Sequence, residues 1–359
     1  MININVLTFG ANSSNGVAFI FPLVVWRKQL LESGINVHMH NRVVQNITDC
    51  DVLFIDSKFY KNSFNKNKEK VLKTLSFFSN KTKVFFFDNS DSAGFILDEV
   101  VPHVSKYLKS SIAKNKNVYK KSIYGNRLHS NYYHSKFGIK DNNPDVSKPL
   151  PDNEISKIGV SWNSGLRDHS LLSPYKIMAY NLTRYSKLLI PGTVSYKSIN
   201  NRSVKYSIRY GATYEKLTLR YQRELMSEIM KNNVNDTKKI NRMEYFNEIL
   251  NSKLVLSPFG LGEITLKDFE IFMTGGVMVK PSMNIIDTWP PFYKENKTYL
   301  PIDWSLSNME DVINDILKEN DFLQYVSNEA NSTYLRFTRS IDAPHLFISR
   351  LKNILKDCD

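Results

Sequence analysis

The strongest constraint on the fold is a repeated alternation of short apolar runs with segments of helical periodicity. In the first part of the chain, apolar runs of strand length cover residues 3–9, 35–40, 52–56 and 84–88. The last two are apolar on both faces, so both faces of their sheet must be covered. Helical patterns at 17–33 and 69–78 supply that cover. This part of the chain is therefore predicted to be Rossmann-like, with a parallel sheet between helices.

The second half of the chain repeats the alternation. Strands are expected at 187–190, 204–210, 253–257 and 276–280, and helices at 217–231, 243–250, 266–273 and 343–356. Between the halves, residues 141–153 hold three prolines among Asp and Asn, as a linker does. The length of 359 residues also predicts about two domains. We expect an α/β fold of two Rossmann-like lobes, 1–155 and 156–340, with a cleft between them and a closing C-terminal helix at 341–359 that packs back on the first lobe.

The charge balance narrows the class of partner. The chain has 48 Lys and Arg against 35 Asp and Glu, a formal net charge of +13. This balance favours an anionic partner, namely a nucleic acid, an anionic membrane surface or a phosphate-bearing small molecule. Two cysteines, Cys50 and Cys358, can build neither a zinc site nor a disulfide framework. With no signal-peptide pattern and no run near the ~20 apolar residues that span a bilayer, the sequence predicts a cytoplasmic location.

The most informative segment is residues 254–281, LVLSPFGLGEITLKDFEIFMTGGVMVKP. It is predicted to form a strand, a glycine turn, a helix and a second strand. Gly260 and Gly262 let backbone amides approach a ligand, and the N-terminus of the helix favours a phosphate. Glu263 and Glu270 are seven residues apart, so both carboxylates project from one face if the helix begins early enough, and they could then bind vicinal sugar hydroxyls. A nucleotide sugar meets both demands; alternatively, Glu263 caps the helix and Glu270 is an exposed acid.

This segment resembles the donor site of GT-B glycosyltransferases. The matching motifs are SPFGLGE at 257–263, KDFE at 267–270 and TGGVMVKP at 274–281. The chain is most similar to the family 1-like and exostosin-like bacterial enzymes of surface-polysaccharide synthesis. The resemblance implies a metal-independent sugar transferase that needs no cofactor, with a nucleotide-diphosphate sugar as donor and a glycan or lipid-linked acceptor. Weaker similarity extends over residues 87–92, 107–109, 124–127, 158–163 and 221–223.

The resemblance also assigns roles in the donor site. It implies that Glu270 binds the donor ribose and that Gly260, Leu261 and Gly262 line the diphosphate and the sugar. Glu263 matches the earlier acid of the family's glutamate pair and is expected to act in catalysis. The spacing of the pair is one residue shorter than in the common retaining enzymes, so retention or inversion stays open.

A leaving diphosphate requires positive charge, which GT-B enzymes supply from Arg, Lys and helix dipoles. The available cations are Arg209, Arg220, Arg223 and Lys267. We favour Arg209 and Arg223, followed by Lys267. Each of them would alternatively form a salt bridge on an exposed face.

An inverting transfer further requires a general base for the acceptor hydroxyl. Asp88 and Asp91 follow the carboxyl end of a predicted parallel strand, where open α/β sheets bind ligands. Asp91 is our first candidate, although Asp91 or Ser92 could instead cap a helix. His129 and His134 are further candidates, but the tyrosines between them favour a packing role.

Three other classes of protein compete with this interpretation. An oxidoreductase would need the Gly-x-Gly-x-x-Gly motif after the first strand, which residues 10–16 do not provide. A nucleic-acid-binding protein fits the charge and the tyrosines interleaved with basic residues at 106–140, but no known nucleic-acid module is present and we expect no nucleic acid. A GT-B relative without turnover fits equally well. In a transferase, residues 106–140 would contact the inner face of an anionic membrane that carries the acceptor.

Overall fold

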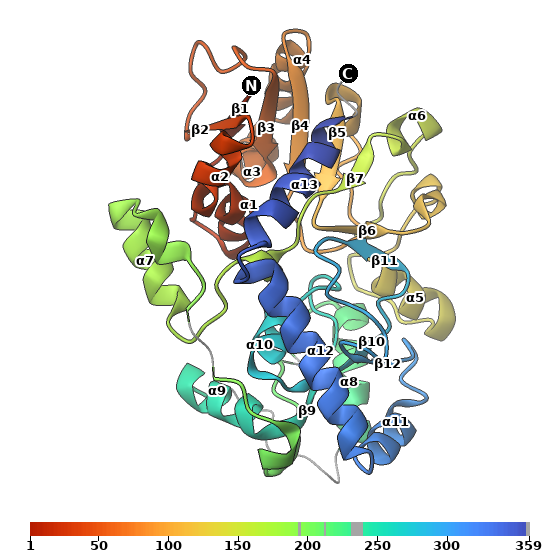
Figure 1. Ribbon diagram of the computed structural model, residues 1–359. Coiled ribbons are helices and arrows are strands. Elements are labelled where there is room, and N and C mark those ends of the chain that lie inside the picture. The colour runs from red at the N-terminus through yellow and green to blue at the C-terminus, as the bar shows by residue number, and fades with distance from the viewer. Residues whose placement is uncertain (193–194, 212, 231–239, 357–359) are drawn as a thin grey trace.

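The computed structural model describes residues 1–192, 195–211, 213–230 and 240–356, which form two lobes (Figure 1). The first lobe is built on a parallel sheet of six strands in the order β2-β1-β3-β4-β5-β7. Its strands are β1 (Ile2–Leu7), β2 (Ile35–His40), β3 (Val52–Asp56), β4 (Lys83–Asp88), β5 (Lys106–Lys109) and β7 (Ile158–Val160). Its helices are α1 (Ser14–Val25), α2 (Arg27–Glu32), α3 (Ser57–Lys66), α4 (Lys68–Ser79), α5 (Leu128–Phe137) and α6 (Asp152–Ile155).

The second lobe is built on a parallel sheet of four strands in the order β12-β10-β9-β8. These strands are β8 (Val204–Ser207), β9 (Ser252–Leu256), β10 (Val277–Pro281) and β12 (Leu300–Ile302). The remaining α-helices are α7 (Ser173–Thr183), α8 (Leu217–Ile229), α9 (Arg242–Asn251), α10 (Leu266–Thr274), α11 (Met309–Ile316), α12 (Asn320–Thr338) and α13 (Ala343–Lys356). Short 3₁₀ helices cover Val101–His103, Lys116–Lys120, Ser164–Leu166, Ser186–Leu189 and Ile199–Asn201.

Two features join the lobes. The strands β6 (Ser111–Ala113) and β11 (Ile286–Thr288) pair antiparallel, one from each part of the chain. One cluster of buried apolar side chains also runs without a break from one face of the first sheet to the helices of the second lobe, and it includes Phe85, Phe87, Phe269 and Phe272. Because burial of apolar surface is the main favourable term in folding, this shared core holds the lobes against each other.

The C-terminal helix returns to the first lobe. Phe347 of α13 packs on Trp26 and Trp162, with ring centroids 5.5 and 5.1 Å apart. Arg350 donates from Nε to the carbonyl of Ser161 at 3.3 Å, just beyond strand β7. The long helix α12 packs on α10 of the second lobe, so the final two helices cross from one lobe to the other (Figure 1).

The predicted α/β fold of two Rossmann-like lobes is confirmed by the two parallel sheets. The strand predicted at 187–190 is wrong, because residues 186–189 form a 3₁₀ helix whose apolar side chains pack on α1 and α7. The helix predicted at 17–33 is divided at Trp26 into α1 and α2. The predicted domain boundaries stay predictions, although strand β7 lies beyond residue 155 and pairs with β5 in the first sheet.

The basic stretch at 106–140 does not form one solvent-facing surface. Its first residues form strand β5, which the sequence pattern did not predict and in which Tyr107, Leu108 and Lys109 are buried. His129 and Tyr133 on helix α5 are buried as well. A membrane contact along the whole of this stretch is therefore not supported by its exposure.

Candidate active site

A cavity of about 730 Å³ lies where the carboxyl ends of the two sheets face each other. In the first sheet, β1 leads to β2 on one side and β3 lies on the other, so the strand order reverses beside β1. Open α/β sheets bind ligands at such a point. The cavity is lined from the first lobe by the β1–α1 loop and by residues after β3 and β4, and from the second by Tyr214, Arg223 and residues 260–262 and 264–266.

The β1–α1 loop turns sharply so that the first turn of α1 faces the cavity. Gly10 has a left-handed φ of 71°, and Ser13 caps the helix by accepting from the Gly16 amide at 3.0 Å. A Cβ atom on Gly16 would lie 2.5 Å from the Gly10 carbonyl oxygen, so this tight turn requires glycine. Asn15, in the first turn of α1, donates to the Asn89 carbonyl and to Asp91 Oδ1, both at 2.8 Å.

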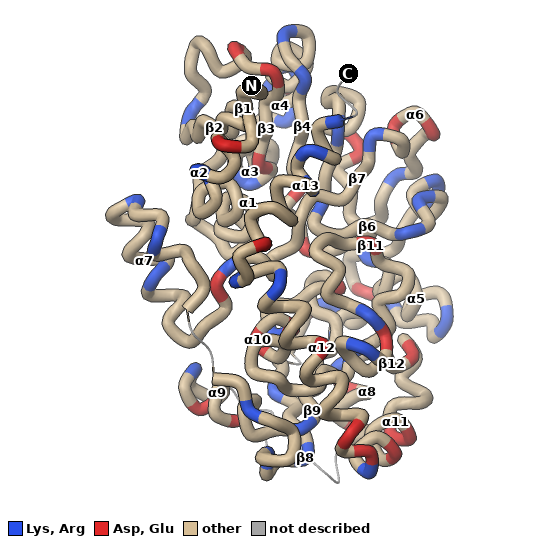
Figure 2. Tube along the Cα trace, viewed as in Figure 1, with Lys and Arg blue, Asp and Glu red and all other residues tan. Residues whose placement is uncertain are grey.

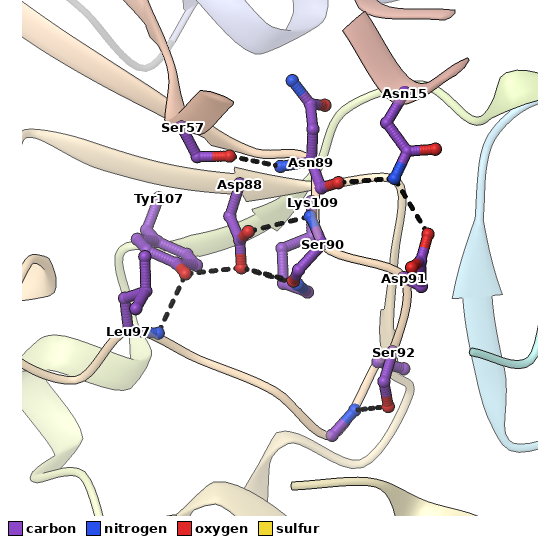
Figure 3. Close-up of polar contacts among 12 residues, drawn as sticks. Asn15, Ser57, Asp88, Asn89, Ser90, Asp91, Ser92, Leu97, Tyr107 and Lys109 are labelled. Atoms are coloured by element: carbon purple, nitrogen blue, oxygen red, sulfur yellow. Dashed lines mark hydrogen bonds and ion pairs between the residues drawn. The ribbon is translucent and has the colours of Figure 1, made fainter. Parts of the chain in front are cut away.

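Asp88 is buried beneath the cavity in a charged network (Figure 3). Its Oδ2 accepts from Lys109 Nζ and from the Tyr107 hydroxyl, both at 2.6 Å, and Ser90 donates to both of its oxygens. Burial raises the pKa of Asp88, but the Lys109 ammonium and these hydrogen bonds outweigh burial, so the net shift is downward. Asp88 is not among the residues described as lining the cavity. Its contacts suit a buried anion that fixes the loop after β4.

Asp91 and Asp56 do line the cavity. Asp91 is exposed, and its carboxylate accepts from Asn15. Asp56, at the end of β3, is buried and accepts from Thr8 Oγ1 at 2.8 Å, from Asn89 Nδ2 at 2.8 Å and from the Lys58 amide at 2.9 Å. Burial raises the pKa of Asp56. Our sequence analysis did not select Asp56, although it ends an apolar strand just as Asp88 does.

The loop Phe259–Glu263, which we call the glycine loop, is docked on the first lobe. Glu263 is fully buried, and its carboxylate accepts from the Ala93 amide at 2.8 Å and from Ser92 Oγ at 3.3 Å. His129 Nδ1 lies 3.6 Å from Glu263 Oε1. Although burial raises the pKa of Glu263, its contact with His129 and its hydrogen bonds bring about a net lowering. Glu263 thus ties the glycine loop to the segment after β4, and it is not among the residues described as lining the cavity.

The glycine loop makes two further contacts with the first lobe, a hydrogen bond and a close approach of two backbones. Arg127 donates from Nε to the Leu261 carbonyl at 2.9 Å, and the backbone of Asp91 lies directly against Gly262. A Cβ on Gly262 would fall well inside van der Waals contact with the Asp91 carbonyl group. Close approach of two backbones therefore accounts for glycine at 262, whereas a Cβ on Gly260 would meet no atom closer than 3.5 Å.

We expect Gly262→Ala to displace the glycine loop from the first lobe, because neither backbone can move away without breaking the hydrogen bonds of Glu263 or Arg127. The melting temperature of this variant should fall below that of the unaltered protein. Gly260→Ala is the matched control and should leave the melting temperature nearly unchanged. Equal melting temperatures for the two variants would contradict the close approach at Gly262.

Among the three predicted cations, Arg223 is the one that lines the cavity. It is buried, donates from Nε to the Phe259 carbonyl at 3.0 Å and from Nη1 to the Gly211 carbonyl, and lies over the Tyr214 ring at 4.9 Å. No carboxylate among the described residues lies within ion-pair distance of it. Burial lowers the pKa of Arg223, but a guanidinium keeps its charge in proteins.

The two other cations have partners in the second lobe. Arg209 Nε lies 2.7 Å from Glu248 Oε2. Lys267 Nζ donates to the carbonyls of Leu256 and Arg209, both at 2.8 Å. Burial lowers the pKa of Lys267 to about 7, so its charge is partial at neutral pH. Neither side chain is among the residues described as lining the cavity, whose lining cations are Arg223 from the second lobe and Lys58 and Lys61 from the first.

The N-terminus of α10 is shaped by a buried acid that our sequence analysis did not select. Asp268 accepts from the Thr265 amide at 3.0 Å and from Thr265 Oγ1 at 2.8 Å, which completes a capping box. Lys280 Nζ lies 3.1 Å from Asp268 Oδ2, and both side chains are fully buried. Ser257 and Tyr293 donate to the same carboxylate at 2.6 and 2.7 Å. The three-residue spacing of Thr265 and Asp268, which is typical of a capping box, is the sequence signal that could have identified Asp268.

Glu270 lies two residues after Asp268 on α10 and is buried. Its Oε1 lies 3.2 Å from Arg242 Nη1 on α9. Burial raises the pKa of Glu270, and Arg242 opposes that rise. The residues described as lining the cavity include Leu266, on the preceding turn, but not Glu270. A ribose would reach this carboxylate only by joining or replacing the contact with Arg242.

No group of three or more His, Cys, Asp or Glu side chains is placed to hold a metal ion among the described residues. Within the same residues, no helix is both long enough and apolar enough to cross a membrane.

Comparison with known proteins finds no matching family model and no matching curated protein. Among solved structures, an alpha-glucosyltransferase in complex with UDP-glucose and DNA containing an abasic site superimposes with a TM-score of 0.48 at 10% identity, over 98% of each chain. HepE of Anabaena in complex with UDP-glucose gives a TM-score of 0.44 at 11% identity, over 98% of this chain and 100% of that chain. MnaA of S. aureus with UDP gives 0.41 at 10% identity, over 99% and 97%. At these identities the similarity concerns the fold alone.

Proposed function

We propose that this chain is a GT-B glycosyltransferase that moves a sugar from a nucleotide-diphosphate sugar to a hydroxyl of a glycan or lipid-linked acceptor in surface-polysaccharide synthesis. The observation that carries the proposal is Arg223, a buried cation that faces the cavity with no carboxylate partner among the described residues. Burying a charge is costly unless it is paired, so an anionic ligand at this wall would supply the missing partner.

A diphosphate suits the groups beside Arg223. The glycine loop offers backbone amides, and residues 264–266 bring the N-terminus of α10, the positive end of its dipole, to the cavity wall. In this proposal the charge that develops on the leaving diphosphate is neutralised by Arg223 and the helix dipole, with no requirement for a metal ion. Lys267 lies behind this wall of the cavity. Its ammonium donates to the carbonyls of Leu256, at the end of β9, and Arg209, and so holds these two segments together.

The acceptor enters from the first lobe. Asp91 is the general base in this proposal, because it lines the cavity, is exposed and is oriented by Asn15. Its carboxylate takes the proton of the acceptor hydroxyl as that oxygen attacks the anomeric carbon and the diphosphate leaves. Asp88 and Glu263 then serve as positioning residues rather than reacting groups, since both are buried in contacts that fix the loops on either side of Asp91.

Nucleotide binding tests the proposal directly. Thermal unfolding should be measured against UDP, GDP, CMP and dTDP and their sugar conjugates, and at least one should raise the melting temperature, because a ligand that binds the folded state stabilises it. An Asp91→Asn variant should keep that shift and lose transfer, since it retains the shape of the cavity. No shift with any member of the panel, in the presence and absence of acceptor glycans, would contradict the proposal.

The role of Glu270 is tested by a pair of variants. If Glu270 binds the ribose, Glu270→Gln should lose the nucleotide-dependent shift while Arg242→Met keeps most of it. If the carboxylate serves only its contact with Arg242, the two variants should lose similar stability and both should still bind nucleotide. Isothermal titration with the responding nucleotide separates the two outcomes.

The nucleic-acid alternative predicts a different result. Binding of random oligonucleotides should then fall steeply with salt, because neutralised phosphates release counterions. Such binding together with no response to nucleotide sugars would replace the transferase proposal.

A further inference from the structure

Helix α7 carries apolar side chains on the side that faces solvent. Leu172, Tyr175, Met178 and Leu182 are 60, 66, 60 and 82% exposed. Their spacing of three or four residues places them on one face of the helix, which we call the α7 face. In Figure 1 the helix projects from the side of the molecule, beside the first lobe. Single exposed apolar residues are ordinary, whereas a contiguous row marks an interaction surface.

The opposite side of α7 is fastened, so the helix cannot simply turn its apolar side inward. Tyr180 is buried in the shared core, and Lys176 Nζ lies 2.6 Å from Asp168 Oδ2. Asn181 Nδ2 donates to the carbonyl of Ala11 in the β1–α1 loop at 3.1 Å. The α7 face is therefore presented to solvent by the fold.

The chain segment that contains α7 is rich in positive charge. Residues 169–214 contain seven Lys and Arg and no Asp or Glu. Arg184 and Lys187, just after the helix, are exposed. Tyr185, between them, and Ile190, three residues after Lys187, are exposed as well. Within α7 itself the single charged side chain is that of Lys176, and Figure 2 shows no acidic residue on the helix. An apolar row beside uncompensated positive charge is complementary to an anionic lipid surface.

The α7 face also lies close to the cavity. Arg184 approaches Gly10, since a Cβ on Gly10 would lie 3.7 Å from its Nη1 atom. Gly10 itself lines the cavity described above and also a second hollow of about 320 Å³, which is lined in addition by Tyr180 and Arg184. Any surface to which α7 binds would thus lie next to the first-lobe side of the cavity.

We infer that α7 docks the protein on an anionic lipid bilayer, with Leu172, Tyr175, Met178 and Leu182 in the headgroup boundary and Arg184 and Lys187 on the lipid phosphates. This surface is separate from residues 106–140, the stretch expected from the sequence, in which Tyr107, Leu108 and Lys109 are buried. The inference rests on the exposed apolar side chains of α7 and on the exposed basic residues just after the helix. It does not depend on whether the cavity transfers a sugar.

Vesicle sedimentation tests the inference. The protein should sediment with vesicles of equal parts phosphatidylglycerol and phosphatidylcholine, and much less with phosphatidylcholine alone. Met178→Asp combined with Leu182→Asp should weaken binding to the mixed vesicles about tenfold or more, since each change removes an inserted apolar group and adds a repelled charge. Ile341→Asp is the matched control: Ile341 is 90% exposed, lies before α13 and should leave binding unchanged.

Two measurements keep the outcome unambiguous. The melting temperature of the double variant should equal that of the unaltered protein, because both side chains are exposed, and any nucleotide-dependent shift should persist. Binding that is equal for both vesicle types, or is lost equally in Ile341→Asp, would overturn the inference. So would a dimer in sedimentation velocity that the double variant dissociates, because the α7 face would then be an interface between copies of the chain.

Discussion

Arg223→Gln should greatly weaken the proposed nucleotide binding and sugar transfer while the protein stays folded. The glutamine keeps a polar group near the Phe259 and Gly211 carbonyls but removes the fixed charge at the cavity wall. Loss of one preorganised group that stabilises developing charge typically costs about 10²–10³ in kcat. Activity with the responding nucleotide sugar and the nucleotide-dependent thermal shift are the two measurements.

The control for this change lies on the same helix. Arg220 is three residues away on α8 and pairs with Glu224 at 2.9 Å on the surface. Arg220→Gln should keep both activity and nucleotide binding, because exposed pairs contribute about 0–1 kcal/mol and Arg220 is not among the residues described as lining the cavity. Equal kcat values for the two variants would exclude Arg223 from the leaving-group site.

Lys109→Met should produce the largest loss of stability among the changes considered. Lys109 and Asp88 form a buried pair at 2.6 Å, with Tyr107 and Ser90 on the same carboxylate. Breaking such a pair leaves a buried charge uncompensated and costs about 3–5 kcal/mol. Urea unfolding gives the value, and the exposed pair of Lys318 and Asp315 provides the contrast, with about 0–1 kcal/mol for Lys318→Met.

The double variant Lys109→Met with Asp88→Asn should recover much of the loss, because neither partner then carries an unpaired charge. If the double variant were as unstable as the sum of both single variants, the cost would come from packing rather than from charge. The double variant also separates stability from function. Recovered folding with poor transfer would show that the network orients the loop which carries Asp91.

Acid should weaken the unaltered protein through the same pair. The pKa of Asp88 is lower in the folded protein than its ordinary value of 3.8. The stabilisation from Asp88 is therefore complete above the unfolded pKa and is lost as the pH falls through the lower, folded pKa. In the Asp88→Asn variant, the free energy of unfolding should therefore change less with pH across this acidic range.

Much of the fold could be predicted from the sequence because strand and helix patterns are local. Runs such as 52–56 and 84–88 are apolar on both faces, and only a covered parallel sheet accommodates two of them in succession. Strand β5 could not be recognised in this way. Its sequence, Lys-Tyr-Leu-Lys, has a charged residue at each end, and Lys109 is buried only because Asp88 on the neighbouring strand neutralises it.

The site was predictable in its position but not in its contacts. The glycine loop and α10 are continuous in the sequence, and their motif identified the segment. The burial of Glu263 depends on the Ala93 amide, 170 residues earlier in the chain, and no local pattern shows that pairing. The same holds for Arg209 and Arg223, which differ in the structure because Glu248 lies beside Arg209 and is distant in the sequence.

The return of α13 to the first lobe has a consequence for synthesis of the chain. Phe347 fills the space between Trp26 and Trp162, and Arg350 bonds the backbone at the end of strand β7. The ribosome makes the first lobe before these residues, which follow the whole second lobe in the sequence. Until α13 is made, both tryptophans of the nascent first lobe therefore lack their contact with Phe347. The first lobe thus need not complete its folding before the second, although it is translated first.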